Sequence, residues 1–365
     1  MIIKKEHYTG NCIYPLERLG IPEKLLFFDI ETTGFSSKTA SLYLIGCLSW
    51  RKGEWTLMQW MAERFIDEQH IVKAFADYCK DFDTLIHFNG DTFDLPFLRK
   101  CAEHYSLSLP FDQMKSIDLL KRIRPLKNIL SLTDLKLKTI EQFLSINRED
   151  SYTGGELISV YHSYEKSHDP RLESFLLLHN KEDIKNMPAL LPVLYYTELP
   201  QIHFSIQEVH QTEHILTILA VCDCLFPVSI QLLGESASFS IDGCHLQMKV
   251  PISTGELYYF YPDYRNYYYL PLEGYAIHKK IACFVDSEHR IKAAPETAFA
   301  KHTGEFLPVG NFKKGICTLE TEIGPLPLLK TSYSSKENYT LYRQEDDFLQ
   351  WYLSYQLEAL LHRKK

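Results

Sequence analysis

The residues of this chain best suited to chemistry are carboxylates in three short segments that lie far apart in the sequence. The segments are LLFFDIETTG, which contains Asp29 and Glu31; HFNGDTFDLPF, which contains Asp94; and HNKED, which ends with Asp183. If folding brings these carboxylates together, they repel one another unless divalent cations neutralise them. Paired cations held by carboxylates are a standard device for hydrolysing phosphodiesters. The sequence therefore predicts a metal-dependent nuclease.

The first two acids lie at the end of an apolar run. Residues 25–30 are typical of a central buried strand. Because Asp29 and Glu31 are two residues apart, their side chains point to the same face of that strand. Two carboxylates on one face form an oxygen-rich site, which favours Mg²⁺ or Mn²⁺ over zinc. The alternative is a solvated strand end, but charges beside a buried strand need partners.

Asp94 occurs where a strand expected at 84–88 gives way to a helix expected at 95–106. Loops that leave the carboxyl ends of strands carry the ligand sites of α/β proteins. Taken alone, Asp94 is equally an acid favoured by the dipole at a helix N-terminus. Asn89 in the same loop can hydrogen-bond the site or the substrate, or cap a turn.

His179 and Asp183 are four residues apart on an expected helix and share a face. Asp183 can complete the metal site. Imidazole titrates near neutrality, so we expect His179 to act as the general base that takes a proton from a metal-bound water. Of two ions, one between Asp29 and Asp183 would orient the water, and one near Asp29, Glu31 and Asp94 would stabilise the leaving 3′ oxygen.

The elements that must position these residues follow from the hydrophobic pattern. Strands are expected at 25–30, 41–50, 54–61, 84–88 and 115–119, and helices at 67–80, 95–106, 133–145 (N-capped by Thr133), 155–166 and 171–190. This order predicts an α/β fold, in which a mixed sheet is flanked by helices in the ribonuclease H-like manner.

A length of 365 residues favours two domains. Prolines between 188 and 200 end the first, which we place at 1–198. Residues 199–365 alternate polar and apolar residues between turn signals and predict a strand-rich α+β domain of unknown role. Helical content is expected near 290–300 and 345–362.

The three acidic segments resemble the motifs of the DEDD (DnaQ-like) 3′–5′ exonuclease superfamily, and residues 20–195 look most like YprB-like ribonuclease H-like domain proteins of bacteria. The resemblance implies that Asp29, Glu31, Asp94 and Asp183 are metal ligands for two ions, Mg²⁺ or Mn²⁺. His179 departs from the pattern, because it stands at the spacing from Asp183 at which one branch of the family has tyrosine.

Residues that flank the acids in the first two motifs are expected to bind substrate; they are Thr32, Thr33, Gly34, Asn89 and Phe93. The resemblance implies single-stranded ends as substrate and leaves DNA and RNA both open. Two alternatives are a structure-selective endonuclease and an inactive nucleic-acid-binding module. In a third, the second domain is an interaction scaffold with a nuclease appended.

The composition of the chain limits the ways in which it can bind nucleic acid. The net charge is −8, with 24 Lys and Arg against 28 Asp and Glu before residue 201, and 15 against 19 after it. This argues against binding nucleic acid by bulk attraction. One stretch is basic and is a candidate for phosphate contact or a solvated helix face; it contains Lys115, Lys121, Arg122, Arg124, Lys127, Lys136 and Lys138.

Two further sequence patterns each allow two interpretations. The aromatic residues at 258–261 (Tyr, Tyr, Phe, Tyr) and the tyrosines at 267–269 can stack on bases, although a hairpin with one buried face is the simpler interpretation. The nine cysteines follow no framework spacing, and we expect reduced thiols in a cytoplasmic protein. A zinc site at Cys222, Cys224, Cys244 and His245 is the less favoured interpretation. No apolar run is long enough to cross a membrane.

Overall fold

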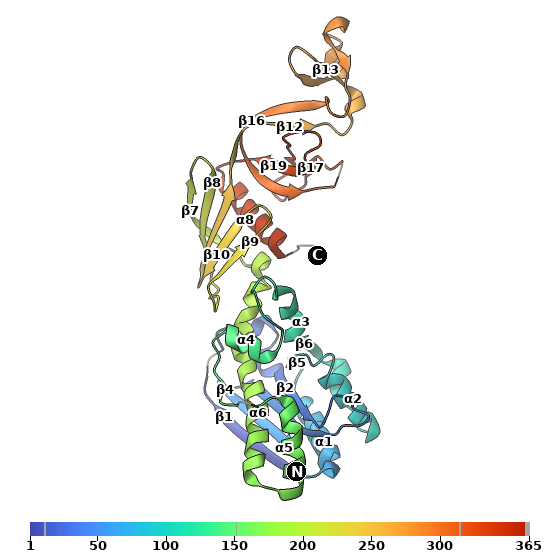
Figure 1. Ribbon diagram of the computed structural model, residues 1–365, viewed down its shortest axis with the longest axis vertical. Coiled ribbons are helices and arrows are strands. Elements are labelled where there is room, and N and C mark those ends of the chain that lie inside the picture. Colours follow the sequence, from blue (N-terminus) through green and yellow to red (C-terminus); the bar gives the residue numbers. More distant parts are fainter. Residues whose placement is uncertain (11, 151, 314, 362–365) are drawn as a thin grey trace. The chain divides into compact units, whose positions relative to one another are not determined.

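The computed structural model describes residues 1–10, 12–150, 152–313 and 315–361. The chain divides into two compact units, Met1–Thr197 and Glu198–Lys365 (Figure 1). In the described residues, every helix is too short or too polar to cross a membrane.

The first unit is built on a six-stranded sheet of order β1-β4-β3-β2-β5-β6. Its strands are β1 (Ile2–Tyr8), β2 (Leu25–Thr32), β3 (Leu42–Arg51), β4 (Glu54–Met61), β5 (Thr84–His87) and β6 (Lys115–Asp118). Strands β1 to β4 pair antiparallel, whereas β2, β5 and β6 run parallel. The sheet is therefore mixed, as predicted.

The α-helices of this unit lie between and after its strands in the sequence and pack on the sheet. They are α1 (Glu68–Cys79), α2 (Asp94–His104), α3 (Leu119–Ile123), α4 (Leu137–Phe143), α5 (Gly154–Ser167) and α6 (Pro170–Leu190). In β2 the even-numbered Phe28 packs its ring against Phe75 of α1, with centroids 5.5 Å apart. The odd-numbered Asp29 meets Asn180 of α6. The two faces of β2 are thus covered by different helices, and the acids share the α6 face.

Close approach of α6 to the sheet depends on Gly46 of β3. Gly46 lies opposite Asp29 in the strand register. A Cβ atom at Gly46 would lie 2.0 Å from Cδ1 of Ile184 and 2.1 Å from Oδ1 of Asn180. A glycine in a strand interior often marks such an approach. The missing side chain lets α6 bring Asn180 next to Asp29.

The structure departs from the predicted elements of this unit in two places. Strand β1, which was not predicted, extends the sheet beyond β4. The helix predicted at 133–145 begins at Leu137, and Lys136 rather than Thr133 precedes it. Asp134 is the reason, because its carboxylate accepts the Lys136 amide at 2.9 Å and forms a turn before the helix.

The second unit is strand-rich, as predicted, with antiparallel sheets ordered β7-β8-β11-β10-β9, β12-β16-β19, β14-β13-β15 and β17-β18. Its strands are β7 (Ser205–Gln211), β8 (Ile215–Val221), β9 (Ile230–Leu233), β10 (Ser238–Asp242), β11 (His245–Pro251), β12 (Ser253–Phe260), β13 (Tyr267–Leu270), β14 (Tyr275–His278), β15 (Ile291–Lys292), β16 (Phe299–Asn311), β17 (Thr318–Leu319), β18 (Leu326–Pro327) and β19 (Glu337–Leu341). Its helices are α7 (Lys279–Ala282) and α8 (Asp346–Leu361).

Two expectations for the second unit were wrong. Residues 290–300 are not helical, because β15 and the start of β16 pair with β13 and β12 there, and sheet pairing overrides local propensity. The tyrosine-rich segments do not form a hairpin with each other, since β12 pairs with β16 and β13 with β14. The helix expected at 345–362 is α8.

Replacing Gly46 with alanine should destabilise the first unit. The added methyl group must displace Asn180 and Ile184, and overpacking of this kind costs about 1–3 kcal/mol. Urea unfolding followed by tryptophan fluorescence would measure it, since Trp50, Trp55 and Trp60 all lie in this unit. Gly155→Ala is the control, because nothing lies near its Cβ position in α5. Equal unfolding midpoints for both variants would contradict the close approach.

Candidate functional site

The acids singled out in the sequence line one pocket of ≈ 420 Å³ in the first unit. Asp29 and Glu31 come from β2, Asp94 from the start of α2, and Asp183 from α6. His179 lines the same pocket. A strand, a helix N-terminus and a late helix thus bring together residues separated by up to 154 positions.

Asp29 is held by the contact between α6 and the sheet. Its Oδ2 accepts a hydrogen bond from Nδ2 of Asn180 at 3.2 Å. The amide of Asn180 is oriented by Gln59 of β4, whose Nε2 donates to Oδ1 of Asn180 at 3.0 Å and to the Leu177 carbonyl at 2.9 Å. With Oδ1 accepting, Nδ2 must face the carboxylate. Gln59 therefore sets which group of Asn180 meets Asp29.

Asp94 is the first residue of α2 and is buried. Its Oδ1 accepts the backbone amide of Ile30 at 3.2 Å. Strand β2 pairs with β5 only from Leu25 to Phe27. The Ile30 amide lies beyond this paired segment, and the Asp94 carboxylate is its hydrogen-bond acceptor. The bond fixes Asp94 against the segment that carries Asp29 and Glu31.

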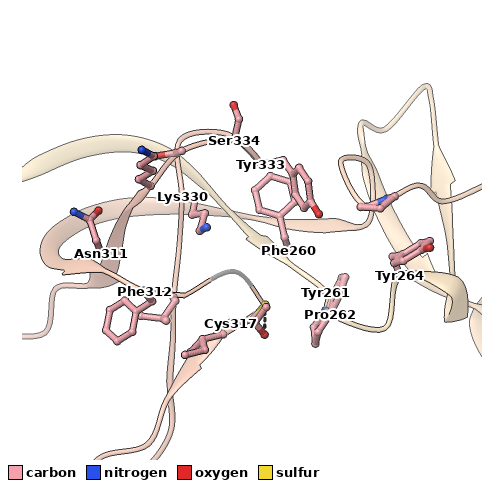
Figure 2. A pocket seen from close by; sticks show the side chains of 16 residues that line it. Phe260, Tyr261, Pro262, Tyr264, Asn311, Phe312, Cys317, Lys330, Tyr333 and Ser334 are labelled. Atoms are coloured by element: carbon pink, nitrogen blue, oxygen red, sulfur yellow. Dashed lines mark hydrogen bonds between the residues drawn. The ribbon is translucent and has the colours of Figure 1, made fainter.

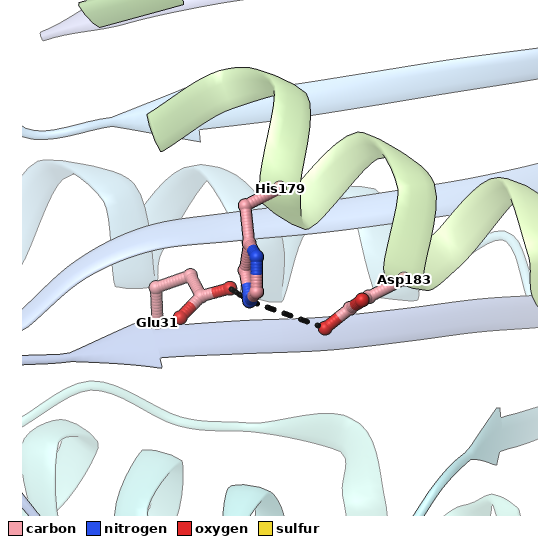
Figure 3. A group of neighbouring side chains, drawn as sticks. All are labelled: Glu31, His179 and Asp183. Atoms are coloured by element: carbon pink, nitrogen blue, oxygen red, sulfur yellow. Dashed lines mark ion pairs between the residues drawn. The ribbon is translucent and has the colours of Figure 1, made fainter. Parts of the chain in front are cut away.

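Glu31, His179 and Asp183 form the tightest group (Figure 3). One ligand atom of each lies within 4.8 Å of the others. Nε2 of His179 is 3.7 Å from Oε1 of Glu31 and 3.6 Å from Oδ2 of Asp183. Figure 3 shows the imidazole descending from α6 to lie between the two carboxylates.

The other ring nitrogen of His179 binds Asp150, a residue that the sequence did not single out. Nδ1 of His179 is 2.7 Å from Oδ2 of Asp150. Burial opposes ionisation of Asp150, but hydrogen bonds from the Tyr152 amide and from His179 hold its pKa below the ordinary value. An ionised carboxylate only accepts, so Nδ1 donates to it. This leaves Nε2 as the nitrogen that faces the acids.

Arg148 ties the segment before α5 to α6. Its Nη1 donates to both carboxylate oxygens of Glu141, at 3.1 and 3.0 Å, and its Nη2 donates to Oδ1 of Asp183. Glu182 accepts the amides of Glu149 and Asp150 at 2.9 and 2.8 Å. Because Arg148 takes one oxygen of Asp183, Oδ2 is the one turned to His179.

The electrostatics of the pocket favour cations. Burial, reinforced by the charges of the neighbouring carboxylates, raises the pKa of Asp29 and of Glu31 well above the ordinary values. The pKa of Asp94 rises to about 7, chiefly through burial. Buried carboxylates that repel one another are an oxygen donor set that suits Mg²⁺ or Mn²⁺. The residues present therefore fit the predicted metal site, with Asp29, Glu31, Asp94 and Asp183 able to hold the ions.

The residues expected to bind substrate divide into two groups. Phe93 lines the pocket, and its ring meets that of Phe35, which is 89% exposed. Thr32 and Thr33 form hydrogen bonds within the turn after β2, which contains Gly34. In another turn, Oδ1 of Asn89 accepts a hydrogen bond from the Thr92 hydroxyl at 2.8 Å. The turn role of Asn89 agrees with its φ of 68°. Among these residues, Phe93 alone is in the pocket lining.

Sequence reasoning missed the residues that support the acids. A signal existed for Gly46, which interrupts an apolar strand. Asn180 adjoins the predicted His179 and could have been noted as a polar residue facing the sheet. Asp150 and Arg148 lie in an irregular segment, and their spacing to Asp183 carries no pattern.

Two members of the basic stretch reach the pocket. Lys136 and Lys138 line it, and Nζ of Lys138 is 3.4 Å from Oδ2 of Asp150. Nζ of Lys121 instead lies 3.8 Å from Oδ2 of Asp91. Part of the stretch is thus placed where a phosphate of a bound strand would need a cation.

A second acidic group, formed by His87, Asp91 and Asp118, serves the fold instead. Asp118 caps α3 and accepts the amides of Asn89 and Asp91. Nδ1 of His87 accepts the Gly90 amide at 3.0 Å, so its proton is on Nε2, which donates to Ser116. Burial lowers the pKa of His87. Both nitrogens are used, which leaves no imidazole lone pair for a metal.

The cysteines give no support to the zinc interpretation. Among the described residues, the groups of three or more close metal-ligand atoms are the two above, and Cys222 and Cys224 are in neither. The Cys222 thiol donates to the Cys224 carbonyl at 3.4 Å, and both residues are buried.

Residues 26–195 match the family model described as the RNase H superfamily. The mixed sheet and the helices of the first unit are thus RNase H-like in fold. A DNA polymerase from Pyrococcus glycovorans is 29% identical over 133 residues, which are 33% of this chain and 16% of the polymerase. The family B DNA polymerase structure from Pyrobaculum calidifontis gives a TM-score of 0.38 at 13% identity, covering 71% of this chain and 40% of that one. The chain spans less than half of either polymerase.

Divalent cations should stabilise the first unit through the acidic pocket. At about 100 times the dissociation constant, Mn²⁺ should add about 2.7 kcal/mol to the free energy of unfolding. In Asp94→Asn this gain should be lost, and the stability in EDTA should rise because one repelling charge is removed from the pocket. Thermal melts with tryptophan fluorescence would measure both. Asp77→Asn removes an exposed acid of the same unit and should behave as wild type; a full Mn²⁺ shift in Asp94→Asn would contradict the site.

Proposed function

We propose that the chain is a metal-dependent nuclease, and that it removes nucleotides from the 3′ ends of single-stranded nucleic acid. One observation carries this proposal: Asp29, Glu31, Asp94 and Asp183 line a single pocket together with His179. The RNase H-like domain supports phosphodiester chemistry. The motif resemblance to DEDD exonucleases supports the 3′–5′ polarity, and the similarity to a DNA polymerase supports a nucleic acid as substrate.

In this proposal the four carboxylates would hold two divalent ions, which would make a bound water more acidic and offset charge at the scissile phosphate. The chain's own residues do the rest. Asp150 fixes the ring of His179, and Nε2 accepts the proton of the attacking water. Asn180 orients Asp29, and Arg148 fixes one oxygen of Asp183 so that the other faces the pocket.

The rim of the pocket suits the end of a strand. Phe93 and the exposed ring of Phe35 offer an aromatic surface on which a terminal base can stack. Lys136 on the same pocket offers a cation for the phosphate. An acidic protein needs such local contacts, because its overall charge does not attract nucleic acid.

A cleavage assay with Mn²⁺ tests the proposed polarity. A 5′-labelled single strand should shorten to a ladder, whereas a 3′-labelled strand should release labelled mononucleotide at once. Asp29→Asn and Asp183→Asn should each lower the rate by about 100- to 1000-fold, as loss of a charge-stabilising group does. Asp77→Asn is the matched control. Internal fragments from both labels would replace the exonuclease proposal with an endonuclease, and wild type inert with every DNA and RNA strand would overturn it.

Asp150 and His179 should act as one unit. His179→Ala should lower kcat by about 100- to 10,000-fold, and Asp150→Ala by a smaller factor. Apart from a small loss through Lys138, which Asp150 also holds, the double variant should be no slower than His179→Ala, because Asp150 acts on the water through the imidazole. Single-turnover cleavage rates at saturating Mn²⁺ measure this cycle. Independent, additive losses would show that Asp150 does not work through His179.

A further inference from the structure

The second unit carries a larger pocket of ≈ 680 Å³, formed by the end of β12 and by the segments that follow β16 and precede β19. Five of its sixteen lining residues are aromatic, and Figure 2 labels them. They are Phe260, Tyr261, Tyr264, Phe312 and Tyr333. Phe260 and Tyr261 belong to the tyrosine-rich segment at 258–261, for which base stacking was the less favoured interpretation of the sequence.

We propose that this pocket binds an unpaired base of single-stranded nucleic acid, with the adjacent phosphates held by Lys330 and Lys336. The proposal rests on the proposed function for the choice of nucleic acid over other anions. It extends that function by giving the second unit a role in binding the strand.

The aromatic rings are already fixed in place. Tyr261 stacks on Tyr267 with centroids 3.9 Å apart and planes at 13°. Phe260 meets Tyr333 edge-on, with centroids 5.4 Å apart and planes at 69°. Rings ordered before binding lose little entropy when a base stacks on them. The volume also lies within the range of about 300–1,000 Å³ that is usual for ligand sites.

The charge of the pocket is opposite to that of its surroundings. Residues 201–365 hold 15 Lys and Arg against 19 Asp and Glu, yet the described lining has two lysines and no acid. Within the described chain, neither Lys330 nor Lys336 has a carboxylate within 4.0 Å. Figure 2 shows the Lys330 side chain beside Phe260 and Cys317. Apolar rings with unpaired amines favour an anionic ligand that has a flat apolar part.

The pocket also offers polar groups for the edge of a base. Asn311 can both donate and accept hydrogen bonds, and Ser334 adds a hydroxyl. An apolar peptide side chain would use the rings and would leave the lysines without partners. A nucleotide uses rings, amines and amide together, which is why we prefer it.

Binding should be measured on the full chain in EDTA, where cleavage cannot proceed. The probes are fluorescein-labelled dT20 and rU20, followed by anisotropy. Tyr261→Ala and Lys330→Glu should each weaken binding by about 10-fold. Tyr275→Ala and Lys249→Glu alter exposed residues elsewhere in the unit and should bind as wild type. Unchanged binding in both pocket variants would overturn the proposal.

Two further measurements separate this proposal from misfolding and from the nuclease itself. A strand with 5-iodouracil should photocrosslink to peptides that contain residues 260–264, 311–317 or 330–336, and crosslinks confined to other peptides would contradict the pocket. Hydrolysis of bis(p-nitrophenyl) phosphate, which is too small to need the second unit, should be unchanged in both pocket variants. If the wild type binds dT20 through the pocket but hydrolyses no ester, the proposed nuclease function is wrong, whereas the proposed base-binding pocket is retained.

Discussion

The arrangement of the acidic pocket depends on how closely α6 lies on the sheet. Gly46 permits that approach, and Gln59 orients Asn180 so that its amide meets Asp29. Because His179 and Asp183 lie on the same helix, one packing contact places both relative to β2. Close-packed interiors transmit small shifts, so a change at Gly46 would move two candidate catalytic groups that it does not touch.

Electrostatics works against this fold in the absence of cations. Burial and mutual repulsion raise the pKa of Asp29 and Glu31, so without a cation the fold favours the protonated forms of these acids, and ionising them is unfavourable. Asp183 differs from the other acids of the pocket, because Arg148 donates to it as well as to Glu141. Among the described residues, Asp29, Glu31 and Asp94 have no Lys or Arg at ion-pair distance, which leaves them available to a ligand.

The two pockets have complementary chemistry. The first is acidic and fits metal ions, whereas the second is aromatic and basic and fits an organic anion. The net charge of −8 makes long-range attraction to nucleic acid weak. Under the two proposals, local cations such as Lys136 and Lys330 hold the strand. Catalysis would then belong to the first unit, while each unit would contribute contacts to the strand.

The sequence by itself determined the mixed sheet, most of its elements and the acids, because side-chain alternation and apolar runs are local properties. Strand β1 was not predicted, since its sequence IIKKEHY contains several charged residues, as edge strands often do. Only the tertiary structure decided that Asp150 orients His179, that Arg148 takes one oxygen of Asp183, and that Phe260 and Tyr261 line a pocket. Those contacts join segments whose distance in sequence carries no period, so they become visible only when the helices pack.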